Sequence, residues 1–483
     1  MNQKSIKFNA AMNMIKAAAS MLFPLISFPY TSRVLGPDGT GKLNFATSFV
    51  AYFILLASIG IPLYGIREVA KVRDDPSSLS ALVQELLVMH GGASVLSFLA
   101  FLGMILLNNK IHAEILLFLI VSASIPLSML TMDWFYQGIE EYAYITVRSI
   151  SFSALSLVAL FLFVHHEGDY WLNAFITIVA SLGSSVLNFW NARQVIFAPR
   201  RRPWDFRRHL KPLFTGYLLN FIISIYVNLD TVMLGFLTTA RNVGYYASAM
   251  KLTKMLLAMV SSFSSVLLPR LSYYTSNGMY GEFNRILQKS LGIMCLLCAP
   301  VTMALILMSR EIILVFAGPK YLPAVTCVAV TAPVIIAIGL NGIFGFQILY
   351  SKGKERMFIA AVLVGAVVNV VINLLLIPRM AHIGAAWGAA IAEIVILLVE
   401  IIMVRTFYQV HWPWLNMLKY FLATATMSGF LLLVRHQVPE ARLWLRIILD
   451  VPLGAAIYFF LLFLMKEEFM GEVYAKLKGR LHA

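Results

Sequence analysis

Apolar runs of about 20 residues, separated by short polar breaks, follow one another along almost the whole chain. A helical run of that length matches the hydrocarbon thickness of a membrane. Only 13% of the residues are charged, which is about half of what soluble domains carry. A β-barrel would instead show short segments of alternating hydrophobicity. The sequence therefore predicts an all-α polytopic membrane protein with fourteen transmembrane helices, at residues 10–31, 41–66, 80–107, 112–137, 144–164, 170–196, 211–238, 243–271, 286–309, 323–350, 357–377, 383–408, 416–435 and 443–465.

Basic residues lie mainly on one side of these predicted spans. With the N-terminus inside, cytoplasmic segments hold 25 of the 38 lysines and arginines, and outer loops hold 10. This bias follows the positive-inside rule, so we expect both termini to be cytoplasmic. The first run contains Lys16 and is followed by no cleavage site, which favours a span over a signal peptide. The net charge of +15 then indicates topology and contact with lipid head groups, and no nucleic-acid partner.

The chain contains a weak internal repeat with an offset of six spans. One match joins two outer turns, and the other joins the cytoplasmic ends of the fourth and tenth spans. The matching segments are Leu35-Gly36 with Gly41 against Leu234-Gly235 with Gly244, and Gln137-Gly138-x-Glu140 against Lys352-Gly353-x-Glu355. Such parallel repeats are typical of transporters.

The repeat predicts two six-helix lobes related by a pseudo-two-fold axis along the membrane normal, followed by two extra helices. We expect an N-lobe at 1–197, a basic cytoplasmic inter-lobe loop at 198–210, a C-lobe at 211–410, and two helices with a cytoplasmic tail at 411–483. The substrate site is expected between the lobes.

Polar residues inside the spans indicate what the lobes handle. Ionisable groups at such depth are costly and usually face a partner or a watery cavity. Lysine and arginine bind phosphate, and asparagine and serine can donate hydrogen bonds to sugar hydroxyls. We therefore predict a basic cavity that binds a polar anionic substrate, formed by Asn13, Lys16, Arg33, Asn220, Ser224, Asn228, Lys251, Lys254, Asn369 and Asn373.

Three acids within the spans are candidates for ion coupling or for ion pairs: Asp133, Asp230 and Glu393. Asp230 can instead form a structural pair with Lys251, and Asp133 can cap a helix end near water. Asn369 and Asn373 can serve helix packing alone. The neighbouring span offers Lys16 no acid, so the basic character of the cavity is expected to exceed the acidic character.

No nucleophile–base constellation and no metal-spaced cluster of histidines and acids is evident, so we expect no cofactor, no metal and no enzymatic activity. A polymerase or ligase of polysaccharides would typically need a large outer loop. The outer loops here are only about 5–12 residues long. An enzyme is therefore the least favoured class.

Several segments of the sequence resemble a known family of transporters, and this resemblance implies a class of substrate. The segment NMIKAAASMLFPLISFPYTSRVLGPDGTGKLNFATSFVAYF, followed by LASIGIPLYGIREVAKVRDD, resembles the N-terminal signature of lipid-linked oligosaccharide flippases of the Wzx type. DWFYQGIEEY and NLDTVMLGF also resemble motifs of that family. The Wzx-type flippase family belongs to the polysaccharide-transporter branch of the MOP exporter superfamily.

The resemblance implies alternating-access transport of undecaprenyl-diphosphate-linked repeat units across the bacterial inner membrane, from the cytoplasmic to the outer leaflet. The product would enter O-antigen, capsule or exopolysaccharide assembly, with membrane lipid, a polysaccharide polymerase and glycosyltransferases as partners. Arg33 would meet the departing diphosphate at the outer mouth. A drug or cation antiporter of the same superfamily is the alternative, and it predicts a cavity dominated by acids.

Overall fold

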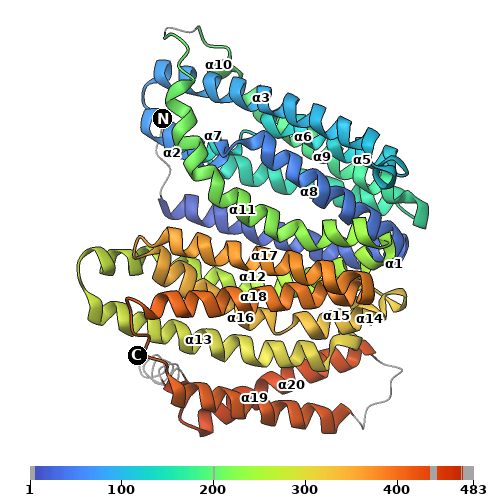
Figure 1. The fold of residues 1–483 in the computed structure, drawn as a ribbon, viewed down its shortest axis with the longest axis vertical. Coiled ribbons are helices and arrows are strands. Elements are labelled where there is room, and N and C mark those ends of the chain that lie inside the picture. Colours follow the sequence, from blue (N-terminus) through green and yellow to red (C-terminus); the bar gives the residue numbers. More distant parts are fainter. Residues whose placement is uncertain (1–5, 200–201, 436–442, 469, 472–483) are drawn as a thin grey trace. The chain divides into compact units, whose positions relative to one another are not determined.

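The computed structural model describes residues 6–199, 202–435, 443–468 and 470–471, and it divides into two compact units, residues 1–244 and 245–483. No strand occurs among the described residues, as the all-α prediction requires (Figure 1). The first unit contains α1 (Ile6–Ser58), α2 (Ile61–Val72), α3 (Pro76–Leu107), α4 (Asn109–His112), α5 (Ile115–Ser122), α6 (Ser124–Leu127), η1 (Ser128–Leu130), α7 (Asp133–Gly138), α8 (Tyr142–Phe163), η2 (Glu167–Asp169), α9 (Tyr170–Asn191), α10 (Arg193–Ile196), α11 (Arg207–Leu237) and the start of α12 (Ala240–Ser276). The second contains the rest of α12, then α13 (Tyr280–Leu307), α14 (Ser309–Phe316), η3 (Pro319–Tyr321), α15 (Ala324–Thr331), α16 (Val334–Asn341), η4 (Gly342–Tyr350), α17 (Glu355–Met380), α18 (His382–Arg405), α19 (Trp414–Arg435) and α20 (Leu443–Leu464).

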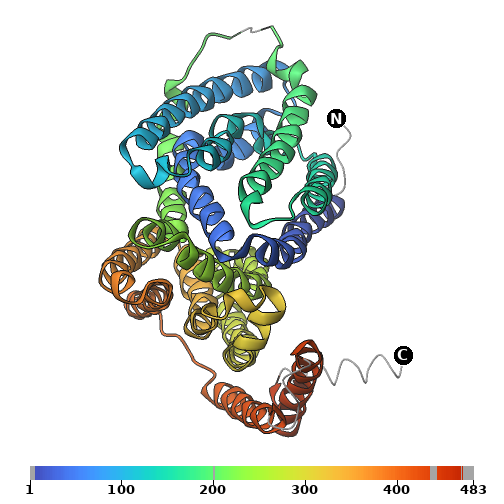
Figure 2. The ribbon, with the colours of Figure 1, turned by 90° about the vertical axis from the view of Figure 1, so that its right-hand side faces the viewer.

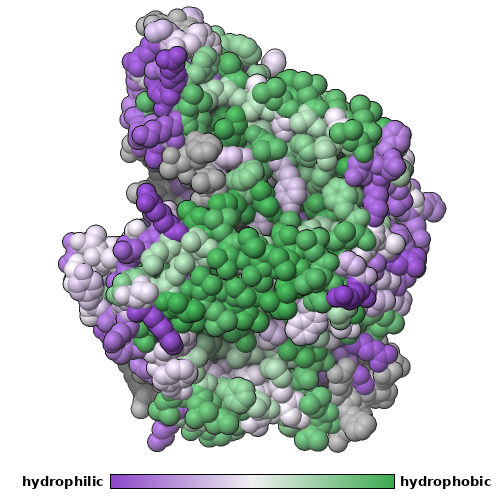
Figure 3. Space-filling view, in the orientation of Figure 1, coloured by the Kyte–Doolittle hydropathy of each residue, from purple (hydrophilic) through white to green (hydrophobic). Residues whose placement is uncertain are grey.

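The helices have the length and surface of membrane spans. Within the described part of the chain, 10 helical segments are long and apolar enough to cross a membrane, and the first, Lys7–Val72, covers two of the predicted runs. Figure 3 shows hydrophobic side chains along the middle of the helices and hydrophilic ones gathered at their ends. Leu96, 70% exposed in α3, is one of many apolar side chains that face outward. Such a surface is stable only against lipid.

The first predicted outer turn is a sharp kink inside α1. Gly36 has φ 64° and ψ −179°, while helix continues on both sides of it. Figure 2 shows this bend in the dark and lighter blue part of the ribbon. Only glycine adopts such a conformation without a steric penalty. The tight turn predicted here from the sequence is therefore confirmed, and it is made at the single residue Gly36.

Two other glycines of the repeated motif allow backbones to touch. A Cβ added at Gly41 would lie 1.7 Å from the carbonyl oxygen of Ala240, and one at Gly244 would lie 2.0 Å from that of Pro37. The second half of α1 thus packs directly against the start of α12. A side chain at either glycine would separate the two segments.

An apolar core fixes α7 against α2. The ring of Trp134 occupies the space beside Gly65, and Val69 occupies the space beside Gly138. Trp134 and Val69 are both buried. Because α7 is locked in this way, the residue at its start, Asp133, has a fixed position in the unit.

The basic inter-lobe loop predicted from the sequence is partly anchored by buried charge. Glu85 of α3 is only 1% exposed. It accepts hydrogen bonds from the side chain of Arg208 and the backbone N–H of Asp205, and its Oε2 lies 2.9 Å from Nε2 of His209. The last part of the predicted loop is thus already the first turn of α11, which begins at Arg207, and Glu85 ties this turn and Asp205 to α3.

In the second unit, small residues let α17 and α18 pack closely. Gly365 accommodates the side chain of Ile396, and Gly388 lies against the amide of Asn373. Glycine and alanine at such interfaces are typical of helix pairs in membranes. The last two helices, α19 and α20, pack against each other and against α13.

Candidate functional site

A break in the fourth predicted span puts a carboxylate in the interior of the first unit. The span consists of α5, α6, η1 and α7, and Met132 just before α7 has φ 44°. A positive φ is uncommon for a residue other than glycine, and such strained positions cluster at functional sites. The break starts a new helix at Asp133, whose side chain is thereby available to other helices.

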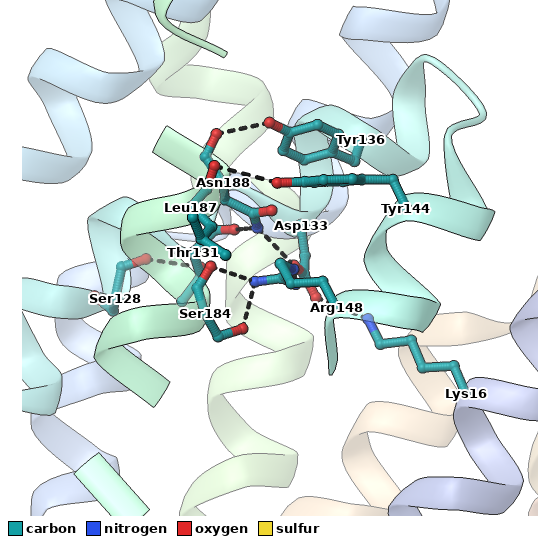
Figure 4. A network of polar contacts seen from close by, with 10 residues as sticks. All are labelled: Lys16, Ser128, Thr131, Asp133, Tyr136, Tyr144, Arg148, Ser184, Leu187 and Asn188. Carbon is teal, nitrogen blue, oxygen red and sulfur yellow. Dashed lines mark hydrogen bonds and ion pairs between the residues drawn. The ribbon is translucent and has the colours of Figure 1, made fainter. Parts of the chain in front are cut away.

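Three helices meet at the carboxylate of Asp133, as Figure 4 shows. Lys16 Nζ of α1 lies 2.8 Å from Oδ2, and Arg148 Nη2 of α8 lies 2.7 Å from Oδ1. Asn188 of α9 donates to the same Oδ1 from its Nδ2 at 3.1 Å. In sequence, Lys16 lies 117 positions from Asp133, and Asn188 lies 55 positions from it.

Arg148 is held more tightly than Lys16. Its Nη1 donates to the carbonyl oxygen of Ser184 at 2.8 Å and also to the Ser184 hydroxyl. The Arg148 side chain is 7% exposed, compared with 24% for Lys16 and 34% for Asp133. The site is therefore closed around the guanidinium and partly open at the lysine.

A second layer of polar contacts fixes Asn188 (Figure 4). Its Nδ2 also donates to the carbonyl oxygen of Thr131, and Tyr136 donates to its backbone oxygen at 2.6 Å. Tyr144 donates to the carbonyl oxygen of Leu187 at 3.2 Å. These contacts orient α9 so that both Ser184 and Asn188 face the charged groups.

The charges at this site do not cancel. Two cations share one carboxylate, so the cluster of Lys16, Asp133 and Arg148 carries one excess positive charge. An isolated charge in hydrocarbon is very costly, and ionisable groups at membrane depth usually face a partner or a cavity. The arrangement can bind an anion at Lys16, on the open side of the cluster, while Asp133 remains paired with Arg148.

The structure also locates the other predicted residues of the first unit. Asn13, one helical turn before Lys16, is exposed. Arg33 is exposed and donates to the carbonyl oxygen of Pro29 at 3.3 Å. Asn228 donates within its own helix, to the carbonyl oxygen of Ser224 at 3.1 Å. Asp230 is buried, and the side chain of Asn220 lies outside the described residues.

The remaining predicted residues belong to the second unit. Lys251 is half-buried and Lys254 is exposed. Asn369 and Asn373 are fully buried, and Nδ2 of Asn373 donates to Oδ1 of Asn369 at 3.1 Å. Glu393 accepts a hydrogen bond from Asn341 at 2.8 Å. That these groups share one cavity with Lys16 stays a prediction.

The residues predicted from the sequence do not include Arg148, or Ser184 and Asn188, which complete its site. Arg148 lies near the start of the 144–164 run, where a basic residue is read as a topology signal. The neighbouring span offers Lys16 no acid in the sequence, whereas in the structure the acid comes from α7. One pattern in the sequence could have indicated this site. Ser184 and Asn188 are four residues apart, so they lie on one side of α9 and form a polar face there.

Comparison with known proteins agrees with this architecture. Residues 6–275 match the family model described as "Polysaccharide biosynthesis protein". A relative from Escherichia coli (strain K12), named "Putative O-antigen transporter", is 22% identical over 413 residues, which cover 84% of this chain and 98% of the relative.

Two solved structures share the fold. The lipid II flippase MurJ in its inward closed conformation matches with a TM-score of 0.65 at 15% identity, over 93% of this chain and 99% of its own. A multidrug resistance MATE family transporter of the MOP superfamily, in its inward-facing conformation, matches with a TM-score of 0.61 at 12% identity, over 81% of this chain and 98% of its own. The fold is thus the all-α architecture of that superfamily.

Proposed function

Because the chain belongs to the polysaccharide biosynthesis protein family, we propose that it is a flippase for undecaprenyl-diphosphate-linked oligosaccharide repeat units. It moves them from the cytoplasmic to the outer leaflet of the bacterial inner membrane by alternating access, with both of its termini in the cytoplasm. The name of the Escherichia coli relative supports a glycan as cargo. The product then serves O-antigen, capsule or exopolysaccharide assembly, with glycosyltransferases acting before it and a polymerase after it.

One observation carries this proposal: Lys16 and Arg148 share the single carboxylate of Asp133. A diphosphate needs cations when it leaves water, and lysine is a compact, mobile point charge for phosphate. Lys16 exchanges Asp133 for a phosphate oxygen, while Asp133 stays paired with Arg148. The sugar enters the unit with the diphosphate, and the prenyl tail remains in lipid.

The membrane potential favours this direction of transport. Moving a diphosphate of charge about −2 outward through an inside-negative potential of about 100 mV is favourable by about 4.6 kcal/mol. The positive site lowers the desolvation penalty along the way, and the potential supplies the direction.

The same observation argues against the antiporter alternative. A site for cationic drugs requires excess acid in the cavity, and the Asp133 cluster has one acid for two cations. Binding of cationic dyes in preference to anionic prenyl lipids would favour that alternative over a flippase.

We expect Lys16→Gln and Arg148→Gln each to lower the initial rate of flipping by roughly tenfold or more. A hydrogen bond to a charged group contributes about 1.5–3 kcal/mol, and 1.4 kcal/mol is a factor of 10. The measurement is transfer of a fluorescent prenyl-diphosphate-linked sugar across the bilayer of proteoliposomes containing the purified protein.

Lys71→Gln is the matched control for this assay. Lys71 pairs with Glu68 on α2, and its side chain is 58% exposed, so the control removes a surface cation. We expect it to flip at the wild-type rate. Wild-type flipping by both the Lys16 and Arg148 variants would rule out the positive site as the path of the diphosphate.

A further inference from the structure

A lysine in the second unit lies among three aromatic rings. Lys352 belongs to the turn between η4 and α17, at the end of the unit that is predicted to face the cytoplasm. Its Nζ lies 4.6 Å from the ring centre of Phe283 and 5.3 Å from that of Tyr280, both at the start of α13. The ring centre of Tyr408, which follows α18, is 4.8 Å away. A cation is attracted to the face of an aromatic ring, so this aromatic cage holds one ammonium group from three directions along the chain.

The rings of the aromatic cage are themselves held in place. Phe283 is 0% exposed, and the hydroxyl of Tyr408 donates a hydrogen bond to the side chain of Asn284. A lysine on a protein surface loses considerable side-chain freedom when it binds a ligand. Because the cage already restricts Lys352 in the folded chain, less freedom remains to be lost on binding.

No acid balances the charge of Lys352. Within the described part of the chain, its Nζ forms no ion pair and no hydrogen bond, and the rings are its only partners. Burial beside the rings lowers the pKa of this ammonium group below that of an ordinary lysine. Aromatic rings stabilise a positive charge but do not neutralise it. A bound anion would do so, and its oxygens would accept hydrogen bonds from Nζ.

A second lysine is held next to the first. Nζ of Lys354 lies 5.7 Å from the ring centre of Phe407, and Phe407 directly precedes Tyr408 in the chain. The two lysines therefore rest on neighbouring rings of the segment that follows α18. Lys354 forms no ion pair with an acid among the described residues, although the exposed Glu355 is next to it in sequence. Like charges repel at short distance, and an anion that contacts both lysines would relieve this repulsion.

The internal repeat shows that the fold does not require this arrangement. Lys352 corresponds to Gln137 of the first unit. Glu355 corresponds to Glu140, which pairs there with Arg73 at 2.6 Å. The first unit thus has an ion pair at the equivalent turn, whereas the second unit has two lysines that no acid of the described chain neutralises.

Exposed apolar side chains lie beside this turn. Phe346 and Tyr350 of η4 are 42% and 41% exposed, and their ring centres are 6.3 Å apart. Both belong to the segment Ala324–Tyr350, which is long and apolar enough to cross a membrane. Aromatic residues at the end of such a segment lie at the level of the lipid head groups. A hydrocarbon chain attached to the anion would therefore meet apolar surface, which favours a lipid over a soluble phosphate.

We propose that Lys352 and Lys354 form a binding site for a lipid whose head group carries a phosphate or a diphosphate. The aromatic rings position the ammonium groups, the phosphate oxygens accept hydrogen bonds from them, and the hydrocarbon chain stays in the membrane. Lysine binds phosphate as a point charge. Two kinds of lipid share this chemistry: an anionic phospholipid of the membrane and the prenyl diphosphate proposed above as cargo. The site lies in the second unit, apart from the Asp133 cluster, and binding there does not depend on transport.

Native mass spectrometry of the purified full-length protein in detergent tests this site, because it counts the bound lipids and gives their dissociation constants. The probes are dioctanoyl phosphatidylglycerol and farnesyl diphosphate, and dioctanoyl phosphatidylcholine is the comparison without net charge. We expect Lys352→Met and Lys354→Met each to weaken binding of an anionic probe by roughly tenfold, because a charge-assisted hydrogen bond is lost. The probe that these variants affect more strongly identifies which of the two kinds of lipid the site prefers.

Three further variants make the test specific. Lys352→Arg keeps the charge and should retain most of the binding. Tyr280→Leu removes a ring of the cage that is 59% exposed, so the fold should persist while binding weakens less than in Lys352→Met. Lys419→Met is the matched control, because Nζ of Lys419 donates to the carbonyl oxygen of Lys466 at 3.2 Å and contacts no ring among the described residues. Its binding should equal that of wild type.

Unchanged binding of both anionic probes in Lys352→Met/Lys354→Met would overturn the proposal. An equal loss in Lys419→Met would also overturn it, because any surface lysine would then serve. Lys354 is exposed, so Lys354→Met tests the site even if Lys352→Met does not fold. Lys16→Gln separates this site from the proposed function. Binding of farnesyl diphosphate that needs Lys16 but neither lysine of the second unit would refute the lipid site and leave the flippase intact, whereas the reverse pattern would leave only the lipid site.

Discussion

Asp133→Ala is expected to lower the free energy of unfolding by about 3 kcal/mol and to reduce flipping to a small fraction of the wild-type rate. Removing one partner of a buried ion pair costs about 3–5 kcal/mol, because the other charge stays buried without compensation. Here that charge is Arg148, whose side chain is 7% exposed. The value lies at the lower end of the range because Asp133 and Lys16 are partly exposed.

Two comparisons make this prediction specific. Asp38→Ala removes an acid that pairs with Arg241, with both side chains about half exposed or more, and surface pairs contribute about 0–1 kcal/mol. Its effect on stability should therefore be small. The double variant Asp133→Ala/Arg148→Met leaves only the partly exposed Lys16 charged in this cluster, so stability should largely return while transport stays low. Equal stability of Asp133→Ala and wild type in detergent would contradict the network in Figure 4.

The sequence was sufficient to predict the class of fold, because hydrophobic runs of membrane length are a local property of the chain. It was also sufficient to single out Lys16 and Asp133, since an ionisable residue inside such a run is conspicuous. It could not pair them. The two residues lie 117 positions apart. Their contact depends on the break in the helix at Met132, which no local sequence pattern predicts.

The glycine motif shows the same limit at the level of the backbone. Glycines after Leu35 indicate a turn, and Gly36 does make one, with φ 64°. The role of Gly41 differs, because it lies within regular helix and is needed for a close contact with Ala240. The sequence shows only that a position is glycine. The structure shows whether glycine is required there because φ is positive, as at Gly36, or because another backbone lies too close for a side chain, as at Gly41.

The contact between α1 and α12 joins residues that correspond to one another in the internal repeat. Arg241 and Asp38 are paired and lie 203 residues apart. A shift of the same length carries Pro37 to Ala240 and Gly41 to Gly244. The contacts of Gly41 with Ala240 and of Gly244 with Pro37 are therefore equivalent and reciprocal. Reciprocal contacts between equivalent residues are what a two-fold axis produces.

Gly41→Ala and Gly244→Ala are each expected to destabilise the protein by at least about 1–3 kcal/mol, the usual cost of overpacking. The added methyl group would lie 1.7 Å or 2.0 Å from a backbone oxygen, so the helices must separate and no side-chain rotation can relieve the clash. The measurement is the thermal midpoint of the purified protein, together with the amount recovered from membranes.

Gly103→Ala is the matched control, because a Cβ at Gly103 of α3 meets nothing within 4 Å. Alanine in the interior of a helix is more favourable than glycine by about 0.5–1 kcal/mol, so its midpoint should equal or exceed that of wild type. The double variant Gly41→Ala/Gly244→Ala should lose less than the sum of the two single losses, since separation of the helices at one glycine relieves the clash at the other. Additive losses would mean that the two glycines act at independent contacts, and wild-type midpoints would mean that α1 and α12 do not touch.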